Sequence, residues 1–213
     1  MKRTLLAIIL TVSFVLPAAC CKKDSSKSHG SSPAATHVSG GGSSSLDKAK
    51  LRVSDGAGKH VVTLRPRGDG GFDRLGERGQ VIGRVKVQSD RVKVLDTSDK
   101  QLAKVKYKSD GIKIYGVGAS YVAKGQWRGG KLRLKDPAGN KFAYLQNSSC
   151  TVKGSTIDVK RLGQMMLVKR DGKAVAKVSQ TMVPAIAAVF GLTEELTPEQ
   201  RTALVVYLMK IGR

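Results

Sequence analysis

The chain has 213 residues and a formal net charge of +22, with 38 Lys and Arg against 16 Asp and Glu. This excess of positive charge attracts polyanions. Aromatic residues make up only 5% of the chain, which argues against a nucleic acid-binding surface that stacks bases. Three cysteines are too few for a disulfide framework. Because no grouping of Cys and His has zinc spacing, neither a metal nor a cofactor is expected.

Residues 1–19 have the layout of a secretory signal. A short basic region precedes an apolar stretch, residues 5–16, and two alanines stand directly before Cys20. A cysteine at the cleavage point resembles the lipobox of bacterial lipoproteins, although Pro17 stands where that family prefers Leu. The resemblance implies a signal cut before a diacylated Cys20, with Cys21 as the alternative acceptor. It also implies a bacterial cell envelope protein, lipid-anchored to a membrane on its exported side.

Two other interpretations of the N-terminal segment stay open, an ordinary cleaved signal peptide and an uncleaved anchor helix. Twelve apolar residues fall short of the about 20 that span a bilayer, which argues against the anchor helix. An ordinary signal peptide does not need a cysteine after the cut. The lipoprotein interpretation therefore accounts for more of the pattern.

Residues 20–48 are expected to hold the lipidated cysteine and a flexible linker. The segment is rich in Ser, Gly and Lys, and such a composition cannot offset the entropy lost on ordering. Its two histidines, His29 and His37, are not expected to bind a metal. The linker ends where an alternation of apolar and polar residues begins.

Residues 49–213 are predicted to form one mainly β domain. Short segments alternate apolar and basic residues with a period of two, as in strands with one buried face, and turns rich in Asp and Gly separate them. A small or short residue recurs about every 20 residues, which suggests one hairpin per repeat. We therefore predict an up-and-down barrel of about ten to twelve antiparallel strands. The recurring residues are Val62, Gly83, Ala103, Ala123 and Ala143.

The C-terminal part predicts helices instead. Residues 184–191 read as a short helix that ends in a glycine cap. Thr197 precedes a proline and stands three residues before Gln200, a capping pattern that begins a helix reaching about Ile211. Because residues 203–209 are apolar on all sides, this helix should be buried in the core.

Consecutive hairpins around an apolar C-terminal helix resemble the tubby C-terminal-like superfamily, which includes tubby proteins, LURP-one-related proteins and phospholipid scramblases. The resemblance is carried by hairpin units such as residues 92–106 and by the apolar run 204–209. It implies a barrel over residues 51–213. No segment matches the phosphoinositide-binding or calcium-binding residues of that family, so no site residue and no scrambling activity is carried over.

Eleven basic residues fall on outward positions of the predicted strands. We expect them to bind anionic membrane lipid or another envelope polyanion, since each basic residue near an anionic membrane contributes about 1 kcal/mol. A basic surface without a specific ligand is one alternative, and a non-catalytic scaffold that recognises another envelope protein is the other. The eleven are Arg84, Lys86, Arg91, Lys93, Lys104, Lys106, Lys108, Lys113, Lys131, Arg133 and Lys135.

An enzymatic function is not expected, because the sequence has neither a Gly-x-Ser-x-Gly motif nor a P-loop. The glycine-rich segment 116–120 fits a turn between strands. A hydrolase would have to rely on His60 or Cys150. The adjacent carboxylates Glu194 and Glu195 are expected to complement the N-terminus of the last helix.

Overall fold

The computed structural model describes one barrel domain. The chain divides into two units, Met1–Gly41 and Gly42–Arg213, and the second contains the described structure. The expected signal peptide, the lipidated Cys20 and the linker lie outside the described residues. The described ranges are 50–109, 111–146, 149–179 and 183–212.

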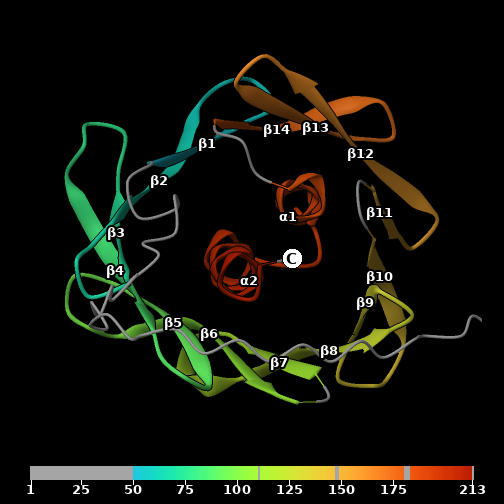
Figure 1. Ribbon diagram of the computed structural model, residues 1–213, viewed down its shortest axis with the longest axis horizontal. Coiled ribbons are helices and arrows are strands. Elements are labelled where there is room, and N and C mark those ends of the chain that lie inside the picture. The colour runs from blue at the N-terminus through green and yellow to red at the C-terminus, as the bar shows by residue number, and fades with distance from the viewer. Residues whose placement is uncertain (1–49, 110, 147–148, 180–182, 213) are drawn as a thin grey trace, which may run out of the picture. The chain divides into compact units, whose positions relative to one another are not determined.

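Fourteen strands of the described ranges form one closed antiparallel barrel around two helices (Figure 1). Each strand pairs with its neighbours in the sequence, and β1 closes the barrel against β14. The strands are β1 (Leu51–Asp55), β2 (His60–Pro66), β3 (Phe72–Leu75), β4 (Val81–Val87), β5 (Arg91–Leu95), β6 (Gln101–Lys108), β7 (Gly111–Tyr115), β8 (Tyr121–Arg128), β9 (Lys131–Lys135), β10 (Lys141–Gln146), β11 (Ser149–Val152), β12 (Ser155–Leu162), β13 (Met165–Arg170) and β14 (Lys173–Ser179).

The mainly β fold, the closed antiparallel barrel and the C-terminal helix are confirmed, but the predicted count of ten to twelve strands is too low. Two of the strands, β3 and β11, have four residues each and lack the alternation of apolar and basic residues. Four residues are too few to show a clear alternation in the sequence. In the structure these segments become strands because their backbones pair with longer strands on both sides.

The repeat of about 20 residues corresponds to a hairpin with a β-bulge. In five hairpins one extra residue stands directly before the recurring small or short residue, where the pairing register shifts by one. Bulges increase the local twist, which helps a sheet to curve into a barrel. The recurring residues are buried, so their small size leaves room for the helices inside.

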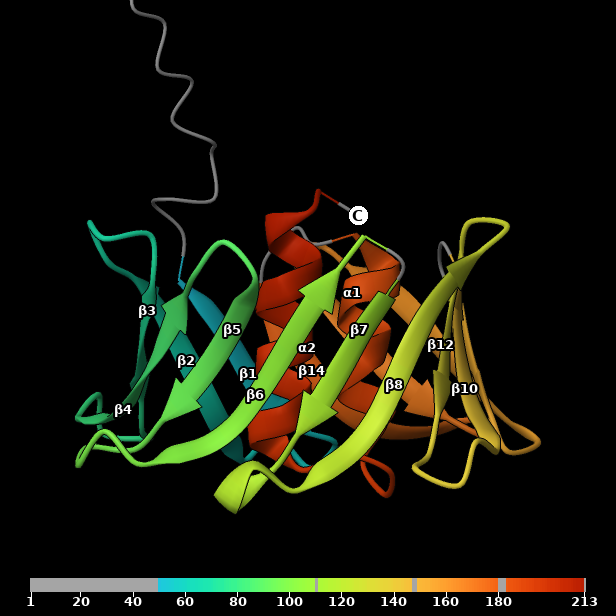
Figure 2. The ribbon, with the colours of Figure 1, turned by 90° about the horizontal axis from the view of Figure 1, so that it is seen from below.

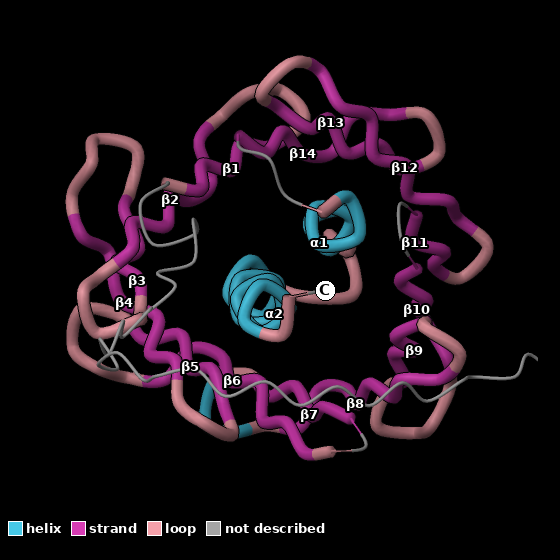
Figure 3. The backbone as a smooth tube through the Cα atoms, in the orientation of Figure 1, coloured by secondary structure: helices cyan, strands magenta, loops and turns pink. Residues whose placement is uncertain are grey.

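The barrel interior is filled by helices (Figure 3). These are α1 (Pro184–Ala188), the 3-10 turn η3 (Val189–Gly191) and α2 (Pro198–Lys210). The predicted start of α2 is confirmed: the Gln200 backbone N–H donates to the Thr197 hydroxyl at 3.3 Å, and the Gln200 side chain accepts from the Thr197 backbone N–H at 3.0 Å. Residues 202–208 are all buried, as expected for a core helix.

The short helix at 184–191 is confirmed, but its final glycine does not act as the expected cap. Gly191 lies inside η3 and does not have a positive φ. A Cβ atom there would lie 2.6 Å from Cγ2 of Ile157 in β12. Glycine is therefore required for close packing of the helical segment against the wall.

The two ends of the barrel differ (Figure 2). We call the end at which β1 begins and α2 finishes the upper end, and the other the lower end. At the lower end, turns such as residues 96–100 and 136–140 repeat one hydrogen-bond pattern. Within the described part of the chain, no helix is long and apolar enough to cross a membrane.

Gly191→Ala is expected to lower the free energy of unfolding by about 1–3 kcal/mol, because the added methyl overlaps Ile157. Urea unfolding measures this. In an Ile157→Ala background the same change should have a smaller effect, since the obstructing atoms are gone. Gly68→Ala, where a Cβ meets nothing within 4 Å, should change stability by less than about 0.5 kcal/mol. Equal losses in both Ile157 backgrounds would contradict the packing argument.

Candidate anion-binding face

A continuous row of cations crosses the outer wall from β5 to β10. Each member stands directly opposite the next on the neighbouring strand, and none is buried. We call these six residues the cationic row. In strand order they are Arg91, Lys106, Lys113, Lys124, Lys135 and Lys141.

The cationic row is unfavourable for the barrel itself. Like charges directly opposite in a sheet are destabilising, at about 0.2–1 kcal/mol for each pair. The inner face of the same strands holds buried apolar residues such as Val105 and Ile114, so the fold does not require cations outside. Five successive opposed pairs therefore form a surface that an anion would stabilise.

The wall is hollowed where the row crosses β6, β7 and β8. The hollow has a volume of about 330 Å³. Gly111 contributes no side chain there, and a Cβ at Gly111 would lie 2.3 Å from the Gly125 carbonyl oxygen. Gly125 faces the core instead, where a Cβ would lie 2.7 Å from Cγ1 of Ile112. None of the described lining residues is acidic, and Asp110 lies outside the described residues. Its basic lining residues are Lys106, Lys108, Lys113 and Lys124.

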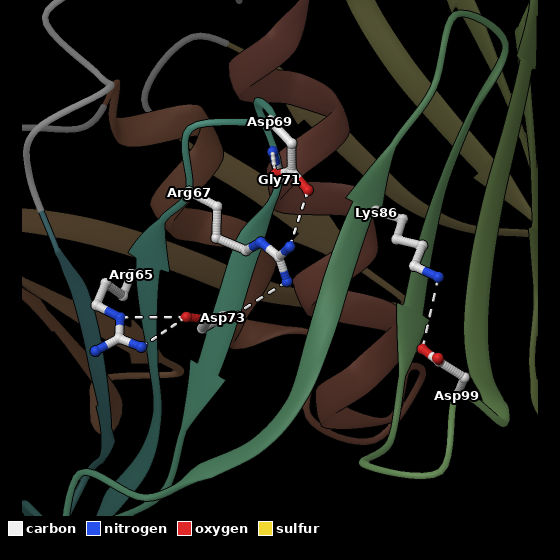
Figure 4. A network of polar contacts seen from close by, with 7 residues as sticks. All are labelled: Arg65, Arg67, Asp69, Gly71, Asp73, Lys86 and Asp99. Carbon is white, nitrogen blue, oxygen red and sulfur yellow. Dashed lines mark hydrogen bonds and ion pairs between the residues drawn. The ribbon is translucent and has the colours of Figure 1, made fainter.

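Basic residues on neighbouring strands are neutralised by acidic partners. Figure 4 shows three such cations: Arg65 and Arg67 contact the Asp73 carboxylate at 2.7 and 3.5 Å, and Lys86 lies 3.5 Å from Asp99. The wall between β2 and β4 is therefore largely compensated.

The four lysines around the hollow differ, because their side-chain ammonium groups make no ion pair or hydrogen bond with any residue in the described ranges. The nearest compensated member of the row is Arg91, 2.7 Å from Asp90. The hydrogen bond from Arg91 lowers the pKa of Asp90, and the charge of Lys106 adds to that effect. Among the described residues, the four lysines at the hollow thus have no ion-pair partner.

None of the eleven predicted basic residues is buried, and they lie on β4 to β9. The structure brings Lys106, Lys108 and Lys113 together at the hollow. Of the eleven, the cationic row contains Arg91, Lys106, Lys113 and Lys135. Lys104 lies beside the hollow with its ammonium 4.4 Å from the centre of the Tyr115 ring. The other five flank this group.

Sequence reasoning missed Lys124 and Lys141, which complete the cationic row, and Gln126, which lines the hollow. Lys124 lies between Ala123 and Gly125, so it lacks the large apolar neighbours that marked the other outward lysines. Alternation counted with small residues as inward positions would have found it.

The two candidate catalytic residues are His60, which is held by a hydrogen bond, and Cys150, which is buried. His60 is hydrogen-bonded to the Thr63 hydroxyl at 3.0 Å. Cys150 is fully buried in β11. Burial, reinforced by the charge of Glu195, raises the pKa of the Cys150 thiol to about 12, so the thiol is protonated at neutral pH. The segment 116–120 joins β7 to β8 as a turn, as predicted.

Glu194 and Glu195 do not complement the N-terminus of α2 as predicted. Both carboxylates lie 3.1 Å from the Arg170 guanidinium on β13, so they fasten the loop before α2 to the wall. The acidic residue in the first turn of α2 is Glu199, which lies 3.1 Å from Arg74 of β3. Among the described residues, no cluster of three His, Cys, Asp or Glu could hold a metal ion.

These observations define a closed antiparallel barrel packed with helices and carrying a row of opposed cations on its outer wall. No family model and no curated protein matches the chain. Among solved structures, it is similar to an X-ray structure of a protein from Arabidopsis thaliana, with 14% identity over 77% of this chain and 91% of that chain. The TM-score is 0.38, and a likeness of this size carries no argument about function.

Lys113→Glu is expected to stabilise the barrel, by about 0.2–1 kcal/mol for each of the two opposed pairs that it relieves. Urea unfolding at low ionic strength measures this, and the gain should shrink at about 1 M salt, where the Debye length is about 3 Å. Lys153→Glu, in the β11–β12 turn, changes the net charge equally and should leave stability unchanged. A loss of stability in Lys113→Glu would show that the row is not repulsive.

The Cys150 thiol is expected to resist labelling in the folded protein. We define the unacylated chain as residues 20–213 with Cys20→Ser and Cys21→Ser. A pKa of about 12 in place of 9 leaves about 1000-fold less thiolate at any pH below 9. Labelling by a water-soluble disulfide reagent should therefore be at least about 100-fold slower in buffer than in urea. Rapid labelling of the native chain would restore Cys150 as a candidate nucleophile.

Proposed function

We propose that this protein is a membrane-anchored lipoprotein of the bacterial cell envelope whose basic barrel binds anionic lipid headgroups or another envelope polyanion. The observation that supports it is the hollow with four lysines that form no ion pair with any described residue, set along the cationic row. An anionic ligand would remove the repulsion between opposed strands and gain the attraction of several cations at once. In this proposal the barrel is a binding module and not an enzyme.

The membrane anchor in this proposal is the diacylated Cys20, on the strength of the lipobox-like sequence. We also propose that the barrel belongs to the tubby C-terminal-like superfamily. The support for this is the order of elements, a run of hairpins followed by an apolar helix inside the barrel. The binding proposal rests on the position of the lysines on the outer wall and does not depend on membership of that superfamily.

Charge reversal at the hollow tests the proposal. The unacylated chain is sedimented with vesicles of phosphatidylcholine alone, or mixed with phosphatidylglycerol, at about 0.15 M salt, where the Debye length is about 8 Å. Binding to the anionic vesicles is expected to weaken roughly 100-fold in the triple variant Lys106→Glu, Lys113→Glu and Lys124→Glu. This follows from about 1 kcal/mol for each basic residue at an anionic surface.

The matched control reverses three charges elsewhere on the barrel: Lys59, Lys153 and Lys177, each to Glu. They lie in the β1–β2 turn, the β11–β12 turn and β14. If binding depends on the hollow, this control keeps most of its affinity. Equal losses in both triple variants would mean that only net charge matters. No preference for anionic vesicles by the parent chain would direct the search to a protein partner.

A further inference from the structure

The upper end of the barrel contains an apolar pocket that the cationic wall does not involve. It has a volume of about 410 Å³ and lies between the strands β8 to β10 and both helices. Its size and composition match small-molecule sites, which are concave and mostly apolar. The side chains that line it are Trp127, Leu145, Val183, Ala185, Ile186 and Leu208.

The mouth of this pocket is left open by glycines. Gly130 and Gly212 complete the described lining, and a Cβ atom added at either would meet no atom of the described residues within 4 Å. Val183, beside them, is 48% exposed although it lines an apolar space. An apolar ligand could therefore enter from solvent without displacing a side chain at these positions.

The surroundings of the pocket are also apolar. Leu162, Met165 and Ile211 are exposed large apolar residues at the upper end, together with Val183. Pairing places Leu162 opposite Met165, and Met165 opposite Ser179, which in turn pairs with the start of β1. The chain thus enters the barrel at the end that carries these residues (Figure 2). Exposed apolar groups are also present at the lower end, at Val81, Val117 and Tyr121, so it is the pocket, and not exposure alone, that distinguishes the upper end.

The chemistry of the lining selects the occupant. Apart from the Trp127 indole, no side chain among the described lining residues carries a polar atom. A polypeptide inserted there would leave backbone amides without partners, which is costly, whereas a hydrocarbon chain has no such groups. Arg128 and Lys131 flank the Gly129–Gly130 turn at the rim and have no ion pair with any residue that the structure describes. Their charges suit an anionic head.

We propose that this pocket holds one acyl chain of an anionic membrane lipid, with its head beside Arg128 and Lys131 and the upper end of the barrel against the bilayer. The inference rests on the proposed function in one respect: the lipid would come from the membrane to which the protein is bound.

The pocket and the outer hollow lie on different faces of the wall. Gln126 lines the outer hollow, and Trp127, the next residue of β8, lines the pocket.

Trp127 is the only tryptophan of the chain, so its fluorescence reports on the pocket directly. The unacylated chain is titrated with dispersed dibrominated stearate, whose bromine atoms quench tryptophan on contact, and with vesicles of phosphatidylglycerol brominated in its acyl chains. Both are expected to quench most of the Trp127 emission saturably. Unbrominated stearate should compete with the first probe.

The pocket is blocked with Ala185→Leu, which fills space in the lining without adding a second tryptophan. This variant should lose quenching by both probes, while Ala174→Leu, on the exposed part of β14, should keep it. Reversing Lys106, Lys113 and Lys124 should leave quenching by stearate unchanged. Failure of the headgroup proposal and failure of the acyl-chain proposal are therefore separable.

Three outcomes would overturn the inference. If neither probe quenches saturably, the pocket takes no acyl chain. If stearate quenches but brominated vesicles do not, the ligand is a free fatty acid and the membrane lipid is excluded. If Ala185→Leu is quenched by vesicles as strongly as the parent chain, Trp127 meets the bilayer at the rim and the pocket is not involved.

Discussion

The packing of α2 inside the barrel is the constraint on which the rest of the structure depends. A helix that is apolar on all sides must be enclosed on all sides, and residues 202–208 are buried throughout. A closed wall of fourteen strands provides that enclosure, and buried alanines such as Ala103 and Ala123 on its inner face make room for helices. Because helices fill the interior, binding functions are left to the outer wall and the barrel ends.

In this arrangement the inward and outward positions of each strand have different roles. Inward positions are selected by packing against the helices and contribute most of the stability, at about 25 cal/mol per Å² of apolar surface buried. Outward positions contribute little to that core. The barrel can therefore tolerate a row of opposed cations, since a few unfavourable pairs at about 0.2–1 kcal/mol each are small beside the burial of the wall and helices. The barrel stays stable with this repulsive outer surface because its core is on the inner face of the wall.

Much of this fold could be predicted from local sequence, and the site only in part. The hairpin period, the buried helix and the Thr197 cap depend on residues close together in the chain. Short strands such as β3 carry too few residues for a periodic signal. The cationic row depends on register across six strands, and the hollow depends on the outward-facing Gly111 standing beside lysines of adjacent strands. The ion pairs of Arg170 with Glu194 and Glu195 join segments that are distant in the sequence, so no local pattern predicts them.

The two proposed sites would act over different distances. Attraction between the lysines and an anionic surface extends over about a Debye length and weakens as salt rises. Apolar transfer into the upper-end pocket acts only at contact and does not need charge. Gln126 and Trp127 place the two sites on opposite faces of one strand, so each would meet a membrane through a different surface. Rising salt would weaken the contacts of the lysines and leave the apolar contact in the pocket unchanged, so the two contributions to binding would differ in their salt dependence.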